Sequence, residues 1–350
     1  MHGKAKKDIL SFDIHQLSDM LKQMGEKEYR ARQVYSWLSR GIKRFCQMTD
    51  LPLRLRHRLE EVFYINEIKP VKVLASEDGS TIKYLFLLMD DNIIESVRMK
   101  YRHGSSICIS TQVGCRMNCT FCASGRCGLV RNLTAGEIYD QVIAINRYNV
   151  EEYGKRVSNI VIMGMGEPLD NYNNLIRFLS MVNSDAGLNI GYRNITLSTC
   201  GLVDKIYSLA REDMPINLSI SLHAPDDGLR RRIMPVAKKY RIDDIIRACN
   251  FYFERTGRRI TYEYILIKGF NDHSQHSLKL SQVLKGTNSI VNLIPLNPVE
   301  GRKYAAPSRD RIKQFKDILE QKGIPVTVRR EMGADIKAAC GQLRGRFVKQ

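Results

Sequence analysis

Three closely spaced cysteines are the first feature of this chain that could do chemistry. Cys115, Cys119 and Cys122 form a C-x3-C-x2-C run within residues 114–122. Structural zinc sites are closed by four ligands, so a zinc ion would also require Cys127, which follows at an odd local spacing. A 4Fe–4S cube normally takes one cysteine per iron, so three cysteines leave one iron open to a small molecule. The number of thiols therefore favours an iron–sulfur cluster over zinc, and the polar loop argues against an inert buried group of cysteines.

The spacing, with the aromatic Phe121 directly before the last cysteine, resembles that of the radical S-adenosylmethionine (SAM) superfamily. This resemblance implies that Cys115, Cys119 and Cys122 hold a 4Fe–4S cluster and that the open iron binds SAM through its amino and carboxylate groups. In the superfamily, the cluster delivers one electron to SAM, and cleavage of SAM produces a radical.

Polar residues at the ends of later apolar runs could bind SAM. GMGEP, residues 164–168, follows such a run; its glycines allow close approach of the backbone, and Glu167 can accept a hydrogen bond from an ammonium group. A glycine-rich turn is more often only a turn, but its position after a strand resembles the superfamily motif for the SAM amino group. The expected SAM contacts are Gly166, Glu167, Ser198, Ser221, Leu222, His223 and Asn297. Taken alone, His223 would more often be a hydrogen-bonded core histidine.

The length, charge and cysteine content limit the class of protein. The 350 residues suit a large domain with a smaller one attached, and no apolar run approaches the ~18 residues of a membrane span. Nine cysteines are an odd set in a chain too long to need disulfides, which favours reduced thiols. The net charge of +18 points to a polyanionic partner such as RNA. Because the first residues lack a secretory signal, we expect a cytoplasmic protein.

The first part of the chain has apolar residues at helical spacing. Helices are expected within residues 12–25, 26–41 and 51–63. Basic residues crowd this stretch: Arg30, Arg32, Arg40, Lys43, Arg44, Arg54, Arg56 and Arg58. Residues 1–66 are therefore either an RNA-binding helical domain or a basic domain with a purely structural role, and charge alone does not decide between the two.

From residue 67 the apolar period changes to that of strands. Runs at 68–75, 81–89 and 92–101, separated by turn signals, predict an antiparallel β-meander over 67–104. Beyond it, strand-like and helical segments alternate six times, which predicts an α/β fold with a partial (β/α)6 barrel over 105–325. Strands are expected at 105–113, 159–165, 194–200, 216–224, 259–267 and 290–298, and helices at 134–150, 173–184, 203–212, 241–257 and 274–286. Functional loops should lie at the carboxyl ends of the strands.

Nearly the whole chain resembles the RNA adenine carbon-2 methyltransferases of the radical SAM superfamily, which modify 23S ribosomal RNA and, in some members, tRNA. The resemblance lies in the basic helical start and in CISTQVGCRMNCTFCASG, MGMGEPLDN, ITLSTCG, SLHAP, VNLIPLNP and RREMGADIKAACGQL. It implies two SAM molecules per product, an RNA substrate and an external one-electron reductant of the flavodoxin or ferredoxin kind. It also implies a C-terminal segment, residues 326–350, that carries a methyl-acceptor cysteine.

Two further cysteines and one carboxylate take roles from this resemblance. Cys340 corresponds to the family's methyl-carrying cysteine, and Cys108 corresponds to its second essential thiol. Glu95 corresponds to the family's proposed proton acceptor. Without the resemblance, both cysteines would be interpreted as small buried hydrophobic residues, and Glu95 as a solvent-facing residue of a strand.

The chemistry of adenine explains why a carrier is needed. Carbon 2 is electron-poor and carries no acidic proton, so ordinary displacement cannot deliver a methyl group to it, whereas a carbon radical can add there. A thiolate is the strong nucleophile that can take a methyl group from SAM. The expected function is therefore methylation of adenosine carbon 2 in 23S rRNA through an S-methylcysteine. The alternatives are methylation of carbon 8 of the same nucleotide, which confers antibiotic resistance, and, more distantly, a non-catalytic zinc protein that binds RNA.

Overall fold

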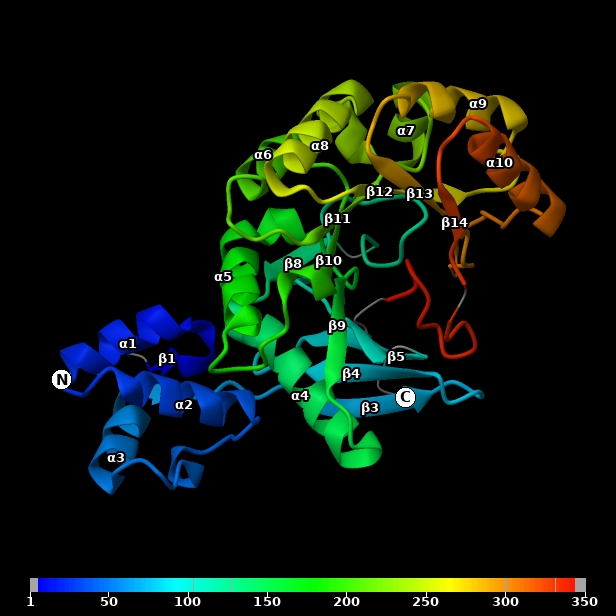
Figure 1. Ribbon diagram of the computed structural model, residues 1–350. Coiled ribbons are helices and arrows are strands. Elements are labelled where there is room, and N and C mark those ends of the chain that lie inside the picture. The colour runs from blue at the N-terminus through cyan, green and yellow to red at the C-terminus, as the bar shows by residue number, and fades with distance from the viewer. Residues whose placement is uncertain (1–5, 103, 127, 300, 331, 344–350) are drawn as a thin grey trace.

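The computed structural model describes residues 6–102, 104–126, 128–299, 301–330 and 332–343. Figure 1 shows a helical region at the N-terminus, a long curved sheet with helices along its outer side, and a C-terminal segment that returns to the sheet. None of the described helices is both long and apolar enough to cross a membrane. Cys127, the fourth ligand that a zinc site would need, lies outside the described residues.

One mixed sheet runs through most of the protein. Its ten described strands pair in the order β14-β13-β12-β11-β10-β9-β6-β5-β4-β3. Seven are mutually parallel: β6 (Gly104–Cys108), β9 (Val157–Ile162), β10 (Ile195–Thr199), β11 (Asn217–Ser221), β12 (Ile260–Leu266), β13 (Ser289–Pro295) and β14 (Val326–Val328). The predicted α/β fold with a parallel sheet is confirmed. It has one parallel strand more than predicted, because the short β14 pairs with the edge of β13.

The predicted β-meander belongs to this same sheet. Its strands are β3 (Lys69–Ala75), β4 (Thr81–Leu87) and β5 (Ile93–Tyr101). β5 pairs antiparallel with β6, and Val97 lies opposite Cys108 in that ladder. Side chains alternate between the two faces of a strand, so Glu95, Val97, Met99 and Tyr101 share one face of β5. The pairing therefore brings residues of the meander beside the first strand of the barrel.

Helices cover the outer side of the parallel strands (Figure 1). Five lie where the periodicity predicts helices: α4 (Ala135–Tyr153), α5 (Tyr172–Asn183), α6 (Val203–Leu209), α8 (Ile242–Thr256) and α9 (Ser274–Val283). Two more were not predicted, α7 (Asp227–Ile233) and α10 (Arg309–Gln321). α4 begins at a capping box between Thr134 and Glu137 and ends at Gly154, whose left-handed conformation suits a C-cap.

The N-terminal helices form a region that contacts α4 through α2 and the segment after it. They are α1 (Ile14–Gln23), α2 (Tyr29–Ser39) and α3 (Leu53–Val62), as predicted. Tyr35 of α2 stacks on Tyr139 of α4 with the ring centroids 6.4 Å apart, and Lys43 forms a 2.7 Å ion pair with the buried Asp140. Buried apolar residues of the helical region and of the barrel form one continuous core. The helical region therefore shares its hydrophobic core with the barrel.

Candidate active site

Cys115, Cys119 and Cys122 lie on a loop between the paired short strands β7 (Gln112–Gly114) and β8 (Leu129–Asn132). All three cysteines line one cavity at the carboxyl ends of the parallel strands, which we call the cysteine cavity. Burial raises the pKa of Cys115 to about 12 and raises that of Cys119 well above its usual value. Thiols of this kind give up their protons to a bound metal, because the thiolate is the ligand.

The donor set of the cysteine cavity fits an iron–sulfur cluster with SAM beside it. Opposite the three cysteines, the wall has polar groups from several strand ends: Gly164, Gly166, Glu167, Ser198, Thr199, Ser221, His223 and Glu263. Among the described residues, no three His, Cys, Asp or Glu side chains are arranged to hold a single metal ion. In a 4Fe–4S cube each cysteine binds a different iron, so its ligands are spaced more widely than those of one ion.

The GMGEP turn brings its backbone against the end of the first barrel strand. A Cβ on Gly164 would lie 2.5 Å from the carbonyl oxygen of Ile109. Gly166 has a φ of +103°, and a Cβ there would lie 2.6 Å from the Cβ of Gln112. Both positions therefore require glycine, because the turn lies directly against the chain at Ile109 and Gln112.

Glu167 has a structural role beside the expected one. Its carboxylate accepts hydrogen bonds from the backbone N–H groups of Leu169 at 3.1 Å and Cys200 at 2.8 Å. Burial raises the pKa of Glu167, and these hydrogen bonds oppose the rise. Each carboxylate oxygen can accept more than one hydrogen bond. Glu167 can therefore fix the turns after β9 and β10 and still offer acceptor capacity to an ammonium group in the cavity.

His223 is a buried, neutral hydrogen-bond donor in the cavity wall. Its Nδ1 accepts from the backbone N–H of Ile265 at 3.1 Å, and its ring meets that of Phe121 edge-on, with the centroids 5.0 Å apart. Burial and the Arg230 charge lower the pKa of His223 to about 3. A neutral imidazole that accepts at Nδ1 carries its proton on Nε2. The aromatic residue of the cysteine motif thus packs against the ring that provides this donor.

The other predicted SAM contacts fall into two groups. Ser198 and Ser221 line the cysteine cavity, with their Oγ atoms 3.4 Å apart. Leu222 is fully buried and lies outside the cavity lining. Asn297 also lies outside it and donates from its side-chain amide to the carbonyl oxygen of Cys340 at 3.0 Å. Asn297 therefore holds the C-terminal segment, and its contact with SAM stays a prediction.

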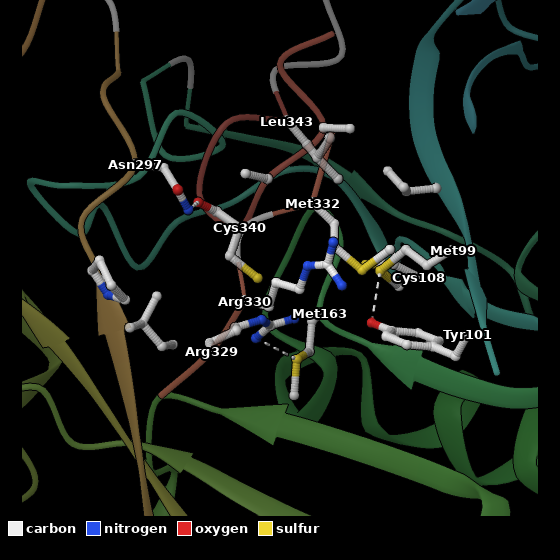
Figure 2. A pocket seen from close by; sticks show the side chains of 15 residues that line it. Met99, Tyr101, Cys108, Met163, Asn297, Arg329, Arg330, Met332, Cys340 and Leu343 are labelled. Atoms are coloured by element: carbon white, nitrogen blue, oxygen red, sulfur yellow. Dashed lines mark hydrogen bonds between the residues drawn. The ribbon is translucent and has the colours of Figure 1, made fainter. Parts of the chain in front are cut away.

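A second cavity of about 270 Å³ contains both remaining candidate thiols, and we call it the two-thiol cavity. Figure 2 shows Cys108, at the end of β6, and Cys340, on the C-terminal segment, among its lining side chains. Both cysteines are free thiols. Cys340 also lines the cysteine cavity. Of the three described residues that line both cavities, Met163, Ile294 and Cys340, only Cys340 has a thiol that could carry a chemical group.

Hydrogen bonds to the cysteine loop hold the segment that carries Cys340. The carbonyl oxygen of Gly341 accepts from the backbone N–H of Ala123 at 2.7 Å, and that of Leu343 accepts from the Ser124 hydroxyl at 2.9 Å. Cys340 itself is held through its carbonyl oxygen, as described above. These bonds fix an irregular segment that no periodicity in the sequence could place.

Arg329 is a functional candidate that the sequence analysis missed. It directly follows β14 and lines the two-thiol cavity, where its guanidinium lies 3.8 Å from the carboxylate of Glu263. Burial raises the pKa of Cys108 to about 12 and raises the pKa of Cys340, and Arg329 opposes both shifts. Arg329 lies in RREMGADIKAACGQL, one of the segments that resemble the family, and this could have indicated a functional role. The sequence spacing between Arg329 and Cys340 could not show that the two residues lie close together.

Glu95 is buried and does not face solvent. Its carboxylate lies 3.3 Å from the ammonium group of Lys83 on β4, and Lys83 donates to the carbonyl oxygen of Lys337 at 3.1 Å. Glu95 shares a strand face with Val97, which lines the two-thiol cavity, but Glu95 is not part of the described lining. The structure thus places this carboxylate behind the cavity wall, connected to the C-terminal segment through Lys83.

The basic residues of the helical region also divide into two groups. Arg32, Arg40, Arg44 and Arg54 are exposed, although Arg32 forms a 2.8 Å ion pair with Asp185, and Arg30 is half-buried. Lys43 is engaged with Asp140, and the guanidinium groups of Arg56 and Arg58 donate to the carbonyl oxygens of Cys46 and Met24. The second group therefore has structural contacts within the protein.

Comparisons with known proteins agree with this geometry. Residues 109–280 match the radical SAM superfamily, and residues 7–65 match the ribosomal RNA large subunit methyltransferase N-terminal domain. A probable dual-specificity RNA methyltransferase RlmN from Alkaliphilus oremlandii is 55% identical over 344 residues, which cover 98% of this chain and 99% of that protein. Its namesake from Clostridium tetani is 50% identical and covers 98% of this chain and 97% of its own. The chain belongs to the RlmN family of radical SAM RNA methyltransferases.

A solved structure supports the same conclusion. The crystal structure of a radical SAM methyltransferase from Sphaerobacter thermophilus matches with a TM-score of 0.93 and 43% identity, covering 97% of this chain and 100% of that one. As a member of the RlmN family, the protein is a methyltransferase that acts on RNA and uses a 4Fe–4S cluster and SAM. This excludes the non-catalytic zinc alternative.

Proposed function

We propose that this enzyme methylates carbon 2 of an adenosine in 23S rRNA, and of an adenosine in tRNA as a second substrate. The observation that carries the proposal is the position of Cys340, which lines both the cysteine cavity and the two-thiol cavity. A methyl carrier must reach SAM on one side and the substrate base on the other. The relatives' name, dual-specificity RNA methyltransferase, supports more than one RNA substrate.

The cysteine cavity would bind both cofactors. Cys115, Cys119 and Cys122 would hold the cluster, and Gly166, Glu167, Ser198, Ser221 and His223 would contact SAM. Cys340 first takes a methyl group from one SAM, as its sulfur–carbon bond forms and the sulfonium–carbon bond of SAM breaks. Arg329 favours the thiolate that this displacement needs. When bound, the cluster supplies one electron to a second SAM, and the resulting radical removes a hydrogen atom from the methyl group on Cys340.

The residues of the two-thiol cavity would complete the transfer. The carbon held by Cys340 would bond to carbon 2 of adenine. The adduct would then return one electron to the oxidised cluster, which balances the electron given to SAM, and would give up the proton of carbon 2. We assign that proton to Glu95, which requires its contact with Lys83 to open. The Cys108 thiolate then attacks the Cys340 sulfur, so that a disulfide forms and the sulfur–carbon bond breaks. The electron pair of that bond passes to the carbon, which takes a proton and becomes the product methyl group.

Nucleoside analysis tests this proposal. The protein is reconstituted anaerobically with iron, sulfide, SAM and a one-electron reductant, then incubated with 23S rRNA or tRNA, and the digested RNA is analysed by mass spectrometry. We expect 2-methyladenosine, and 8-methyladenosine in its place would establish the sister reaction. Cys115→Ala should lose iron and product. The matched control is Cys249→Ala, because Cys249 is fully buried in α8 and lines neither cavity.

A further inference from the structure

Arg230 is a fully buried arginine behind the cysteine cavity. It lies in α7, and its exposed fraction is 0%. Its guanidinium donates to the backbone carbonyl oxygens of Cys200 at 2.6 Å, Leu222 at 3.2 Å and Tyr240 at 3.3 Å. In the part of the chain that the structure describes, none of its hydrogen bonds goes to a carboxylate.

This arrangement satisfies the hydrogen bonds of Arg230 without a carboxylate among its acceptors, and the Asp227 carboxylate on the same helix compensates its charge only through space. Carbonyl oxygens are dipoles and carry no net charge, whereas a guanidinium stays protonated in proteins. Removing an unpaired charge from water is costly, so a buried cation usually has an anionic partner. Burial lowers the pKa of Arg230, and the neighbouring Cys200 and Cys119 oppose this shift most strongly. The shortest hydrogen bond of Arg230 goes to the carbonyl oxygen of Cys200, so the guanidinium lies directly behind a residue of the cavity wall.

The lining of the cysteine cavity itself supplies no positive charge. Its described residues include Glu167 and Glu263 but no lysine or arginine. The Arg230 guanidinium also donates to the carbonyl oxygens of Ser221 and Leu222, directly before the lining residue His223. A fixed cation thus lies one residue behind a cavity that would hold three thiolates. An anionic group bound in this cavity would compensate the Arg230 charge further.

We propose that Arg230 is a positioning residue whose buried charge favours the reduced state of the 4Fe–4S cluster in the cysteine cavity. The proposal rests on the cluster site assigned under the proposed function. One-electron reduction adds a negative charge to the cluster, and a cation fixed nearby in a medium of low polarity stabilises that added charge. The reduction potential of a cluster responds to the charges and hydrogen bonds around it. Arg230 therefore raises the potential and makes the electron transfer to the cluster easier.

A redox titration of the reconstituted cluster, followed by electron paramagnetic resonance, tests this inference. In Arg230→Met, which removes the charge from a side chain of similar length, we expect reduction to become at least about tenfold less favourable, a shift of about 59 mV to more negative potential. Arg230→Lys keeps the charge and should retain most of the wild-type potential.

Arg98→Met is the matched control. Arg98 is as deeply buried, at 1% exposure, but it lies on β5 against Asn149 and the ring of Tyr153 and lines neither cavity. Its removal should leave the potential unchanged. A wild-type potential in Arg230→Met, or an equal shift in Arg98→Met, would overturn the inference.

Two further outcomes separate this inference from the proposed function. A wild-type protein that binds no cluster would contradict the cluster site itself. If Arg230→Met does not fold, Arg230→Lys decides the question, because lysine loses the forked hydrogen bonds but keeps the charge. A Lys variant with a potential near that of the wild type supports a role for the charge, and one shifted negatively by about 59 mV or more contradicts it.

Discussion

At the scale of single residues, the reactivity of Cys340 depends on opposing influences on its thiol. Burial raises the pKa of Cys340, Arg329 lowers it, and Glu263 raises it again. The thiolate is the nucleophile, so at a given pH the reactive fraction falls as the pKa rises. Arg329 therefore increases the fraction of Cys340 that is present as the thiolate at a given pH.

Arg329→Met should make Cys340 less reactive at neutral pH. Loss of the cation raises the pKa of Cys340, and a rise of about one unit lowers the thiolate fraction about tenfold. The reactivity should recover as the pH rises through the new pKa. Iodoacetamide labelling of the Cys340 peptide across a pH series, quantified by mass spectrometry, measures this.

Arg330→Met is the control for this series. Arg330 lines the same cavity but is not among the charges that shift the pKa of Cys340. An identical pH profile in both variants and the wild type would show that Arg329 has no influence on this thiol.

Cys108→Ala should trap the RNA on the enzyme. Without the second thiol, the bond between Cys340 and the substrate carbon has no nucleophile to break it. The variant should still methylate Cys340 and consume the second SAM, yet accumulate a protein–RNA adduct, which denaturing gels and mass spectrometry of the Cys340 peptide would detect. Cys340→Ala should give no adduct.

Cys200→Ala separates the two candidate resolving thiols. Cys200 lines the cysteine cavity and lies outside the described lining of the two-thiol cavity. Its removal should therefore cause no accumulation of adduct. Normal turnover in Cys108→Ala, or an adduct only in Cys200→Ala, would reverse the assignment of Cys108.

At the scale of elements, the basic helical region contains exposed arginines that could bind RNA and other basic residues that have contacts within the protein. Neutralising Arg40, Arg44 and Arg54 to Gln should weaken RNA binding and lower its salt dependence by ~1 in slope for each phosphate that is no longer neutralised. These side chains are exposed, so stability should change little. Filter binding or fluorescence anisotropy across a salt series measures the slope. An unchanged slope would leave this region with a structural role only.

Lys43→Ala should lower the stability of the protein and leave its RNA binding unchanged. Lys43 pairs with the fully buried carboxylate of Asp140, which also accepts from the backbone N–H of Ile68. Leaving a buried charge without its partner costs roughly 3–5 kcal/mol, so the free energy of unfolding should fall by about that much. Urea unfolding gives the value, and the salt dependence of RNA binding by the folded protein should stay that of the wild type.

Much of the element order could be predicted, because the strands of the barrel are apolar runs and its longer helices are amphipathic. α10 was predictable in principle, since Ile312, Phe315 and Leu319 recur at helical spacing and contact the core. α7 and β14 are too short to show a period. That β5 pairs with β6 follows from contacts across the sheet, which no local pattern contains.

The residues of the site also divide into those that the sequence predicted and those that it did not. The cysteine run and the strand-end residues were found from type and spacing, and the structure gathers Gly166, Glu167, Ser198, Ser221 and His223 around the three cysteines. Arg230 and Arg329 were missed, because an arginine in a basic chain carries no signal of burial. Their importance comes from burial and from neighbours distant in the sequence.

At the scale of the whole molecule, the enzyme is one packed body around two cavities. The meander supplies one wall of the two-thiol cavity, the barrel supplies the cysteine cavity, and the C-terminal segment supplies the thiol that lines both. The helical region continues the same core through α4. An RNA held by the exposed arginines would therefore be positioned relative to the active site by the contact between this region and α4.

Gly136→Ala tests that contact at a single position. Gly136 lies in the first turn of α4, and a Cβ there would come within 2.3 Å of the Asp8 carboxylate and 2.7 Å of the Ser11 hydroxyl. Asp8 cannot move freely, because it accepts from the N–H groups of Leu10 and Asn66 and from the Ser11 hydroxyl. Alanine is the better helix former, so any loss must come from this clash.

We expect Gly136→Ala to lower the free energy of unfolding by about 1–3 kcal/mol, the usual cost of overpacking, and to reduce RNA methylation more than it reduces methylation of Cys340. Gly191→Ala is the control, because a Cβ there meets nothing within 4 Å and its φ of −63° suits alanine. Urea unfolding and the two methylation assays give the comparison. If Gly136→Ala matched Gly191→Ala in stability and in both methylation assays, the tight contact between the helical region and α4 would not be needed for RNA methylation. The basic surface of the region would then bind RNA without fixing its position relative to the active site.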